Sequence, residues 1–307
     1  MFAYVVRRLL SAIPTLFIIV ALAFFMMRIA PGGPFDGQRK LPPEIEHNME
    51  VAYNLDKPVY VQFFKYLQGV VHGDFGPSFK NKDFTVSQLI MVGAPVSVRL
   101  GLTALTFAVM IGLFLGTYAA LRQNTFADFA TMAGAMIGIT IPSFVIAPLC
   151  ILVFAVWLRW LPAGDWSHGD LSHIILPITT LTLPQIAVVS RLSRGSVLEV
   201  LRSNFVRTAR AKGLPGWKIM QRHVLRASLL PLVSYLGPAA ASLMTGSLVV
   251  ERIFGLPGIG RYFIDGALNR DYTVVMGVVI VYAVLILVLN LLADIAYGWL
   301  DPKVRYD

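Results

Sequence analysis

The side chains of this chain that could do chemistry are mainly cationic, and many of them lie in one stretch. Between positions 191 and 226 the sequence holds nine Arg and Lys residues against a single acid, Glu199. The basic residues are Arg191, Arg194, Arg202, Arg207, Arg210, Lys212, Lys218, Arg222 and Arg226. Clustered guanidinium and ammonium groups bind anions or acidic surfaces, so the stretch fits nucleic acid, anionic lipid or another protein.

Other reactive side chains are sparse and form no catalytic pattern. The only cysteine, Cys150, lies in an apolar run and is expected to be a buried hydrophobe. His168 and His173 lie near Asp165 and Asp170, but a polar loop explains this group more simply than a metal site does. The sequence has no GxxxxGK[ST] phosphate loop and no HExxH motif. We therefore expect no catalytic residue, no metal and no nucleotide hydrolysis in this chain.

Composition separates the possible partners of the basic stretch. The 307 residues are 56% hydrophobic and only 14% charged, and the mean hydropathy is +0.69. Charged residues make up about a quarter of a soluble domain, so this is the composition of a multi-pass membrane protein. In such proteins Lys and Arg mark cytoplasmic loops, which disfavours nucleic acid as the reason for the net charge of +9. Placing nine charges in lipid would cost about 20 kcal/mol or more, so the stretch must contact water, lipid headgroups or another protein.

Six apolar segments are long enough to be membrane helices. They are predicted at about 9–27, 99–121, 129–158, 173–189, 229–250 and 274–300. Prolines at 142 and 148 interrupt the third segment, and prolines at 177 and 184 break the fourth, so a short or kinked span is expected there. Two GxxxG spacings, at 112/116 and 134/138, predict close packing of the second and third helices, with loose small-residue packing as the equal alternative.

The predicted topology divides the chain into four parts. Residues 1–30 form an N-terminal transmembrane helix, 31–95 an extracytoplasmic loop, 96–300 the main transmembrane domain and 301–307 a cytoplasmic tail. The basic loop 191–226 lies on the cytoplasmic side, as do both termini. Within 31–95 one helical face predicts a helix against the membrane surface or the bundle, formed by Val59, Phe63, Tyr66, Leu67 and Val70. The GLPGIG segment, 255–260, fits no nucleotide motif and is expected to be a tight turn in an extracytoplasmic loop.

Part of the basic stretch has the pattern of two short helices. Ser203 or Asn204 can cap a helix that runs to Lys212, and Gly213 stands where a left-handed residue ends a helix. A second helix is predicted to start near Gly216 and lead toward the fifth span. Such a rigid protrusion between two spans fits docking to another protein better than simple contact with lipid.

The segment RTARAKG, 207–213, resembles the cytoplasmic loop of binding-protein-dependent ABC importer permeases. Gly213 matches the glycine of the family's Glu-Ala-Ala…Gly motif, Ala209 its second alanine, and Leu230-Pro231 its closing dipeptide. Arg207 stands where Glu is usual and Thr208 replaces the first alanine, a form similar to the peptide and nickel branch of the family. The resemblance covers nearly the full length, through RRLLSAIPTLFIIV, FFMMRIAPGGP, HGDFGPSFKNKDFTV, PSFVIAPL, SLVVERIFGLPGIGRYF, ALNRDY and DPKVRY.

This resemblance implies an all-α protein with the type I ABC importer permease fold, six transmembrane helices and a large extracytoplasmic loop after the first. It implies a permease subunit that moves oligopeptides across the bacterial inner membrane by alternating access. The implied partners are a second permease, two ATPase subunits that bind ATP and Mg, and an extracytoplasmic peptide-binding protein. The expected ATPase-coupling residues are Arg207, Thr208, Ala209, Arg210, Ala211, Lys212, Gly213 and Leu214. Within that group, Thr208, Ala209, Ala211, Gly213 and Leu214 are expected to form the surface seated on the ATPase.

Polar residues in or near the spans are the candidates for the substrate pathway. They are Gln185, Glu251, Asn290 and Asp294. Dipeptides, nickel chelates and other peptide-like solutes stay open as alternative substrates. An ion-coupled secondary transporter is an alternative of another class, which would usually have more spans and two related halves.

Overall fold

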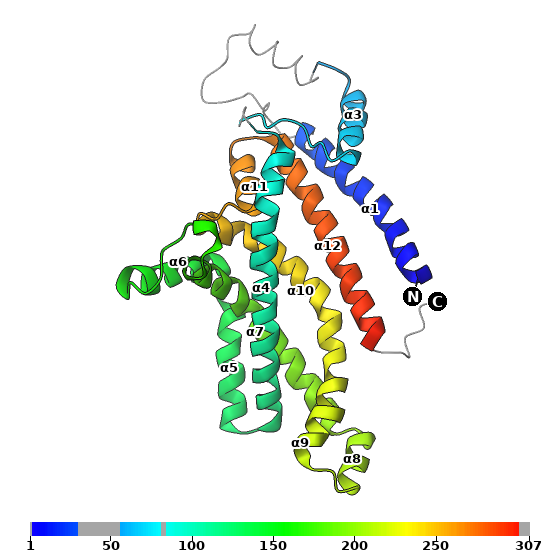
Figure 1. The fold of residues 1–307 in the computed structure, drawn as a ribbon, viewed down its shortest axis with the longest axis vertical. Coiled ribbons are helices and arrows are strands. Elements are labelled where there is room, and N and C mark those ends of the chain that lie inside the picture. The colour runs from blue at the N-terminus through cyan, green and yellow to red at the C-terminus, as the bar shows by residue number, and fades with distance from the viewer. Residues whose placement is uncertain (1, 30–55, 81–83, 301–307) are drawn as a thin grey trace. The chain divides into compact units, whose positions relative to one another are not determined.

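The computed structural model describes residues 2–29, 56–80 and 84–300, and every regular element in these ranges is helical. Within these ranges five helices are long and apolar enough to cross a membrane, and a bent pair makes a sixth if it counts as one span. This confirms the all-α, polytopic class (Figure 1). Residues 31–55 and 81–83 of the predicted loop and the tail 301–307 lie outside the described residues.

The helices follow one another as a series of long spans separated by short pieces. The long ones are α1 (Phe2–Ile29), α4 (Val86–Leu121), α7 (Leu171–Leu201), α10 (Leu225–Ile253) and α12 (Tyr272–Leu300). The shorter ones are α3 (Val59–Val71), α5 (Phe126–Thr140), α6 (Ser143–Cys150), α8 (Asn204–Ala211), α9 (Gly216–Ile219) and α11 (Ile259–Leu268). Two π-helical segments, Ile151–Trp157 and Met220–Val224, follow α6 and α9.

The chain divides into two compact units. The first contains Met1–Val5, Val98–Leu256 and the chain from Ile286 onward, and the second contains Val6–Ser97 and Pro257–Leu285. The predicted four-part division is a division by topology, and it does not coincide with these units.

In the first unit α7 packs against both α5 and α10. Gly112 and Gly116 of α4 lie directly on α7: a Cβ on Gly116 would stand 2.4 Å from the Ser190 carbonyl oxygen. On α5 only Gly138 is in such contact, against Leu183 of α7, whereas Gly134 has open space. The predicted pairing of the second and third helices through these glycines is therefore wrong, because all three close contacts are made with the fourth helix.

The third predicted span is a bent pair of helices. Ile141 is extended (φ −98°, ψ 122°) because the ring of Pro142 excludes the helical conformation in the preceding residue. The two helices on either side of this break are inclined at 99°. Pro148, in contrast, lies within α6 without ending it.

Two other spans begin or end where the sequence did not indicate. The helix α7 runs 31 residues through Pro177 and Pro184, so its predicted end at 189 is wrong, and Arg191 and Arg194 lie on the helix itself. Packing on both sides sustains such a helix despite the lost backbone donors. The helix α4 starts at Val86 and continues through Pro95, so it takes up part of the predicted 31–95 loop.

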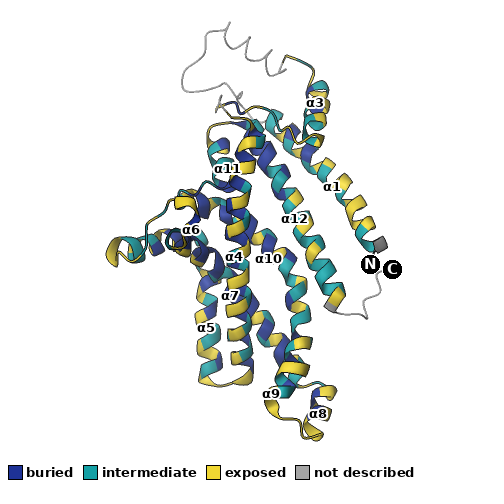
Figure 2. Cartoon of the chain, in the orientation of Figure 1, coloured by how far each residue is buried: buried dark blue, intermediate teal, exposed yellow. Residues whose placement is uncertain are grey.

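In the second unit α1, α3 and the first part of α12 share a core. Phe24, Phe63, Met276 and Ile280 are each at most 6% exposed, and Tyr66, Leu67 and Val70 pack against them. This confirms the predicted amphipathic helix at 59–70 (Figure 2). Phe63, Tyr66, Leu67 and Val70 face other helices, but Val59 of the predicted face is 43% exposed. The helix α11 was not predicted; it follows Gly255, whose φ of +66° agrees with a tight turn in GLPGIG.

Candidate functional site

The helix α8 ends in a well-formed turn at Gly213. The Leu214 N–H donates to the Ala209 carbonyl (3.3 Å) and the Gly213 N–H to the Arg210 carbonyl (2.9 Å), the hydrogen-bond pair of a Schellman motif. Gly213 has a φ of +72°, in the left-handed region that favours glycine. The predicted helix, turn and second helix are confirmed, and α9 starts at the expected Gly216.

The start of α8 differs from the prediction in one detail. Ser203 is the N-cap residue, but its hydroxyl donates to the Val200 carbonyl (2.6 Å) instead of capping α8. The Ser203 carbonyl accepts the Arg207 N–H (3.1 Å). The hydroxyl thus fastens the end of α7 to the start of α8.

One face of α8 is buried within the chain. Val206 (0% exposed) and Ala209 (5%) pack with Val197 of α7, Ala120 of α4 and Ile219 of α9. Ala209 was expected on the surface seated on a partner, and its burial corrects that assignment. Its small side chain instead lets α8 lie close to the ends of α4 and α7.

The remaining coupling candidates are all exposed. They are Arg207, Thr208, Arg210, Ala211, Lys212, Gly213 and Leu214. Two aromatic residues beside them, Phe205 and Trp217, are 49% and 64% exposed. Sequence reasoning did not assign them to this surface, although Phe205 is adjacent to Val206 and so falls off the buried stripe. Aromatic residues and arginine are enriched at protein interfaces.

We call the segment 203–219 the docking knob. It lies at the end of the first unit where α4 turns into α5 (Figure 1). The Arg202 guanidinium donates to Gln123 Oε1 in that turn (3.3 Å). The knob is therefore attached to α4 by packing, and the residue just before it is attached to the following turn by a hydrogen bond.

A bidentate ion pair lies near the same turn. The Asp128 carboxylate, 1% exposed, accepts hydrogen bonds from Arg194 Nε (2.7 Å) and Nη2 (2.6 Å). It also accepts the Asn124 N–H (3.0 Å). The pair joins the first turn of α5 to α7; from the sequence, Arg194 was counted only among the topology charges and Asp128 was not singled out.

Of the pathway candidates, Gln185 lines a cavity. Its carboxamide accepts a hydrogen bond from Tyr235 Oη (2.9 Å) and donates to Ser242 Oγ (3.2 Å), both on α10. The cavity, of about 320 Å³, is also lined by residues of α5, α6 and α7, including Gly138, Ile141, Phe144 and Thr180. Tyr235 and Ser242 were missed, although their seven-residue separation places them on one helical face.

The other pathway candidates do not join Gln185. The Asn290 side chain lies over Gly237, where a Cβ would stand 2.3 Å from its Oδ1. Gly237 is two positions from Tyr235, roughly 200° around the helix, so Asn290 meets a different face of α10. Glu251 is 0% exposed near the end of α10, and Asp294 is half-buried on α12. None of these three residues lines the Gln185 cavity.

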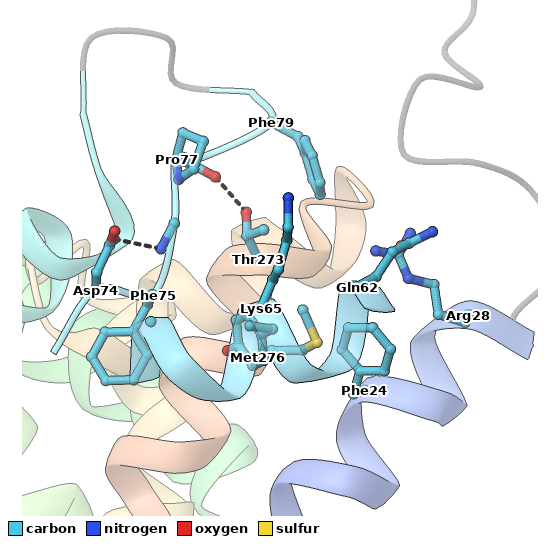
Figure 3. Close-up of a pocket in the computed structure, with 13 residues that line it drawn as sticks. Phe24, Arg28, Gln62, Lys65, Asp74, Phe75, Pro77, Phe79, Thr273 and Met276 are labelled. Atoms are coloured by element: carbon cyan, nitrogen blue, oxygen red, sulfur yellow. Dashed lines mark hydrogen bonds between the residues drawn. The ribbon is translucent and has the colours of Figure 1, made fainter. Parts of the chain in front are cut away.

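A second cavity, of about 220 Å³, lies in the second unit (Figure 3). Residues of α1, α3, α12 and the loop 74–79 line it, among them Phe24, Arg28, Lys65 and Tyr66. The loop is held by hydrogen bonds from the Gly76 N–H to Asp74 (2.9 Å) and from Thr273 to the Pro77 carbonyl (2.8 Å). Burial raises the pKa of the Tyr66 phenol above its usual range, so it is neutral at physiological pH.

The expected polar loop near His168 has a structural role for one histidine. His173 Nδ1 lies 2.9 Å from the Gly164 carbonyl oxygen and so ties α7 to the preceding loop. Among the residues that the structure describes, no three His, Cys, Asp or Glu side chains are grouped as a metal site.

Comparisons with known proteins identify the family. The model of the binding-protein-dependent transport system inner membrane component matches residues 112–306, and the model of its N-terminal part matches residues 1–101. The oligopeptide transport system permease protein OppB of Salmonella typhimurium is 52% identical over 306 residues, covering 100% of both chains. The dipeptide transport system permease protein DppB of Bacillus subtilis is 41% identical and covers 98% of this chain and 97% of its own.

Solved structures show the same fold at low sequence identity. One is the inward-facing MetNI methionine ABC transporter, with a TM-score of 0.58 and 18% identity over 70% of this chain and 97% of that chain. Another is an amino acid ABC transporter, with a TM-score of 0.51 and 15% identity over 71% of this chain and 95% of that chain. The expected importer permease fold is confirmed. With its family model and full-length relatives, the chain belongs to the binding-protein-dependent transport system inner membrane components.

Proposed function

We propose that this chain is the permease subunit of an ATP-driven importer that moves oligopeptides across the inner membrane by alternating access. The observation that carries the proposal is the 52% identity, over the whole of both chains, to a permease of an oligopeptide transport system. A dipeptide permease at 41% identity favours dipeptides as the second candidate substrate.

The proposed complex contains a second homologous permease, two ATPase subunits and an extracytoplasmic peptide-binding protein. The family description, which names a binding-protein-dependent system, supports the last of these. The sequence lacks a GxxxxGK[ST] loop, which agrees with ATP and Mg being held by the ATPase subunits and not by this chain.

In this proposal the exposed side of α8 seats in a cleft of one ATPase. Thr208, Ala211 and Leu214 form the contact, and Arg207, Arg210 and Lys212 position it. Closure of the ATPases on ATP would favour one arrangement of the knob and, through it, one access state of the spans, which is a population shift by differential contact. The positive-inside rule supports a cytoplasmic knob and, by counting spans, cytoplasmic termini.

The substrate pathway is proposed to pass the cavity lined by Gln185. With one N–H donating to Ser242 and Oε1 accepting from Tyr235, the carboxamide keeps a second N–H and a second lone pair. A carboxamide offers the same donor and acceptor as a peptide group, so it suits recognition of a backbone whose side chains vary. Glu251, Asn290 and Asp294 remain secondary candidates, and the packing of Asn290 on Gly237 favours a structural role for that residue.

Reconstitution tests the proposal. The permease pair, the two ATPases and the binding protein are placed in liposomes, and uptake of a labelled oligopeptide is measured with ATP on the ATPase side. We expect uptake that stops when either the ATPases or the binding protein is omitted. Uptake driven by an ion gradient without ATP would contradict the proposal. So would a complex that takes up a dipeptide or a nickel chelate and takes up no oligopeptide. Gln185→Leu in the same vesicles should raise KM for peptide and leave basal ATP hydrolysis unchanged.

A further inference from the structure

We infer that the Asp128–Arg194 ion pair makes α5 move with the docking knob, so that ATP-driven motion reaches the wall of the Gln185 cavity. Both residues are positioning residues for transport, because neither lines that cavity. The inference rests on the proposed function, in which an ATPase moves the knob.

The geometry of the pair is that of a rigid joint. Two guanidinium nitrogens, Nε and Nη2, lie 2.7 and 2.6 Å from the two carboxylate oxygens, so the contact fixes orientation as well as distance. The Asn124 N–H adds a third hydrogen bond to the carboxylate at 3.0 Å, which ties in the α4–α5 turn. Asp128 is 1% exposed and the Arg194 side chain 28%, so the pair is partly shielded from water.

The arginine is well placed to carry motion from the knob. Arg194 lies on α7 three residues before Val197, which packs against Val206 and Ala209 of α8. Gly116 of α4 touches the same turn of α7, since a Cβ there would stand 2.9 Å from the Arg194 backbone nitrogen. On this side α7 thus contacts α4 through backbone and holds α5 through the ion pair.

The aspartate is at one end of a helix whose other end forms the cavity wall. Residues Gly138 and Ile141, 10 and 13 positions after Asp128, line the cavity that contains Gln185. At 1.5 Å per residue, the ion pair and this wall are about 15–20 Å apart along α5. A straight helix transmits displacement over that length, whereas the break at Ile141 gives the wall a place to hinge.

A purely structural role for the pair makes a different prediction. If it only stabilises the fold, its loss lowers the amount of complex, and ATP hydrolysis and uptake fall together. If it transmits motion, ATP hydrolysis persists and the number of peptides imported per ATP falls. The ratio of the two rates separates these outcomes.

The first experiment measures both rates in proteoliposomes containing the full complex with its binding protein. Asp128→Asn keeps the shape of the side chain, and Arg194→Gln removes the partner. Glu199→Gln and Glu199→Ala, at an exposed position on the same helix, are matched controls. We expect uptake per ATP to fall about fivefold or more in both test variants and to be unchanged in the controls. A fivefold change is about the lower end of the coupling effects between two sites in proteins.

The double variant Asp128→Asn/Arg194→Gln distinguishes a pair from two separate residues. If the two residues act only through each other, the double variant should lose no more coupling than the more strongly affected single variant. Arg194→Gln leaves a buried carboxylate without its cation, so it is the variant that can fail to assemble. Asp128→Asn then carries the test, because it leaves only a partly exposed arginine. Parallel loss of uptake and ATP hydrolysis, or coupling equal to that of the controls, overturns the inference.

A distance measurement tests the joint independently of the transported solute. Nitroxide labels are placed at Phe126→Cys on α5 and Asn204→Cys on α8, both exposed, with Cys150 replaced by Ala. With the pair intact, we expect the same distance distribution without nucleotide and with ATP and vanadate, and a nucleotide-dependent change after Asp128→Asn. A change of equal size with the pair intact overturns the inference. Absence of peptide uptake by the unmodified complex would instead refute the proposed function.

Discussion

At the residue scale, the left-handed turn at Gly213 gives the docking knob its shape. A Cβ added there would meet no atom within 4 Å, so space is not what requires glycine. The φ of +72° is the constraint, and the turn's two hydrogen bonds from Gly213 and Leu214 depend on it. A β-branched residue in this conformation adds strain of about 1–2 kcal/mol, and opening the turn would relieve that strain.

We predict that Gly213→Val abolishes ATP-coupled uptake while the amount of protein in the membrane is unchanged. Gly213→Asn should retain most uptake, because Asn tolerates the left-handed region. Gly216→Val is the control for added bulk, since Gly216 also has open space but no positive φ. Vesicle uptake and immunoblotting of membranes measure the result, and normal uptake by Gly213→Val would show that the turn is not needed for coupling.

At the element scale, the contact between α4 and α7 depends on small residues. Cβ atoms at Gly112 and Gly116 would stand 2.6 Å from Val189 Cβ and 2.4 Å from the Ser190 carbonyl oxygen. No rotamer change relieves a clash with backbone, so a larger side chain must push the helices apart. Gly134, the first glycine of the second GxxxG spacing, meets no such atoms.

We predict that Gly116→Leu lowers the melting temperature of the detergent-purified complex, through overpacking of about 1–3 kcal/mol or more. Gly134→Leu is the matched control and should melt within about 2 °C of the unmodified complex, since substitutions at open positions usually cost less than 0.5 kcal/mol. Thermal unfolding followed by tryptophan fluorescence measures both. Equal melting temperatures for the two variants would mean that α4 and α7 do not pack as described.

Local signals in the sequence predicted the structure of the knob more accurately than they predicted the bounds of the long helices. The glycine at 213 and the residues before it specify a helix end within a few residues, and α8 follows that pattern. The course of α7 was missed because Pro177 and Pro184 are breakers in isolation, whereas packing between α5 and α10 sustains the helix. Contacts between distant segments leave no local pattern. For this reason the burial of Ala209, the pairing of Asp128 with Arg194 and the separation of Asn290 from Gln185 were not predictable.

At the scale of the whole molecule, α7 connects the docking knob with the Gln185 cavity inside the first unit. The knob carries exposed basic and aromatic residues, and α7 extends from there for 31 residues, about 46 Å, to Leu171. Between the two ends of this helix lie Gln185 and its cavity. In the proposed complex, an ATPase bound to the knob acts on the substrate pathway without contacting it, because α7 is continuous from the knob to the Gln185 cavity.

The measurement that tests this account most directly is a photo-cross-link from the knob. A photoreactive amino acid replaces Ala211, which is exposed on α8, in the complex reconstituted with its ATPases; the control replaces Leu171, 70% exposed at the far end of α7. The account predicts an adduct between position 211 and an ATPase subunit and none from position 171. If position 211 forms no ATPase adduct in a complex that hydrolyses ATP and imports peptide, the proposed docking surface is wrong.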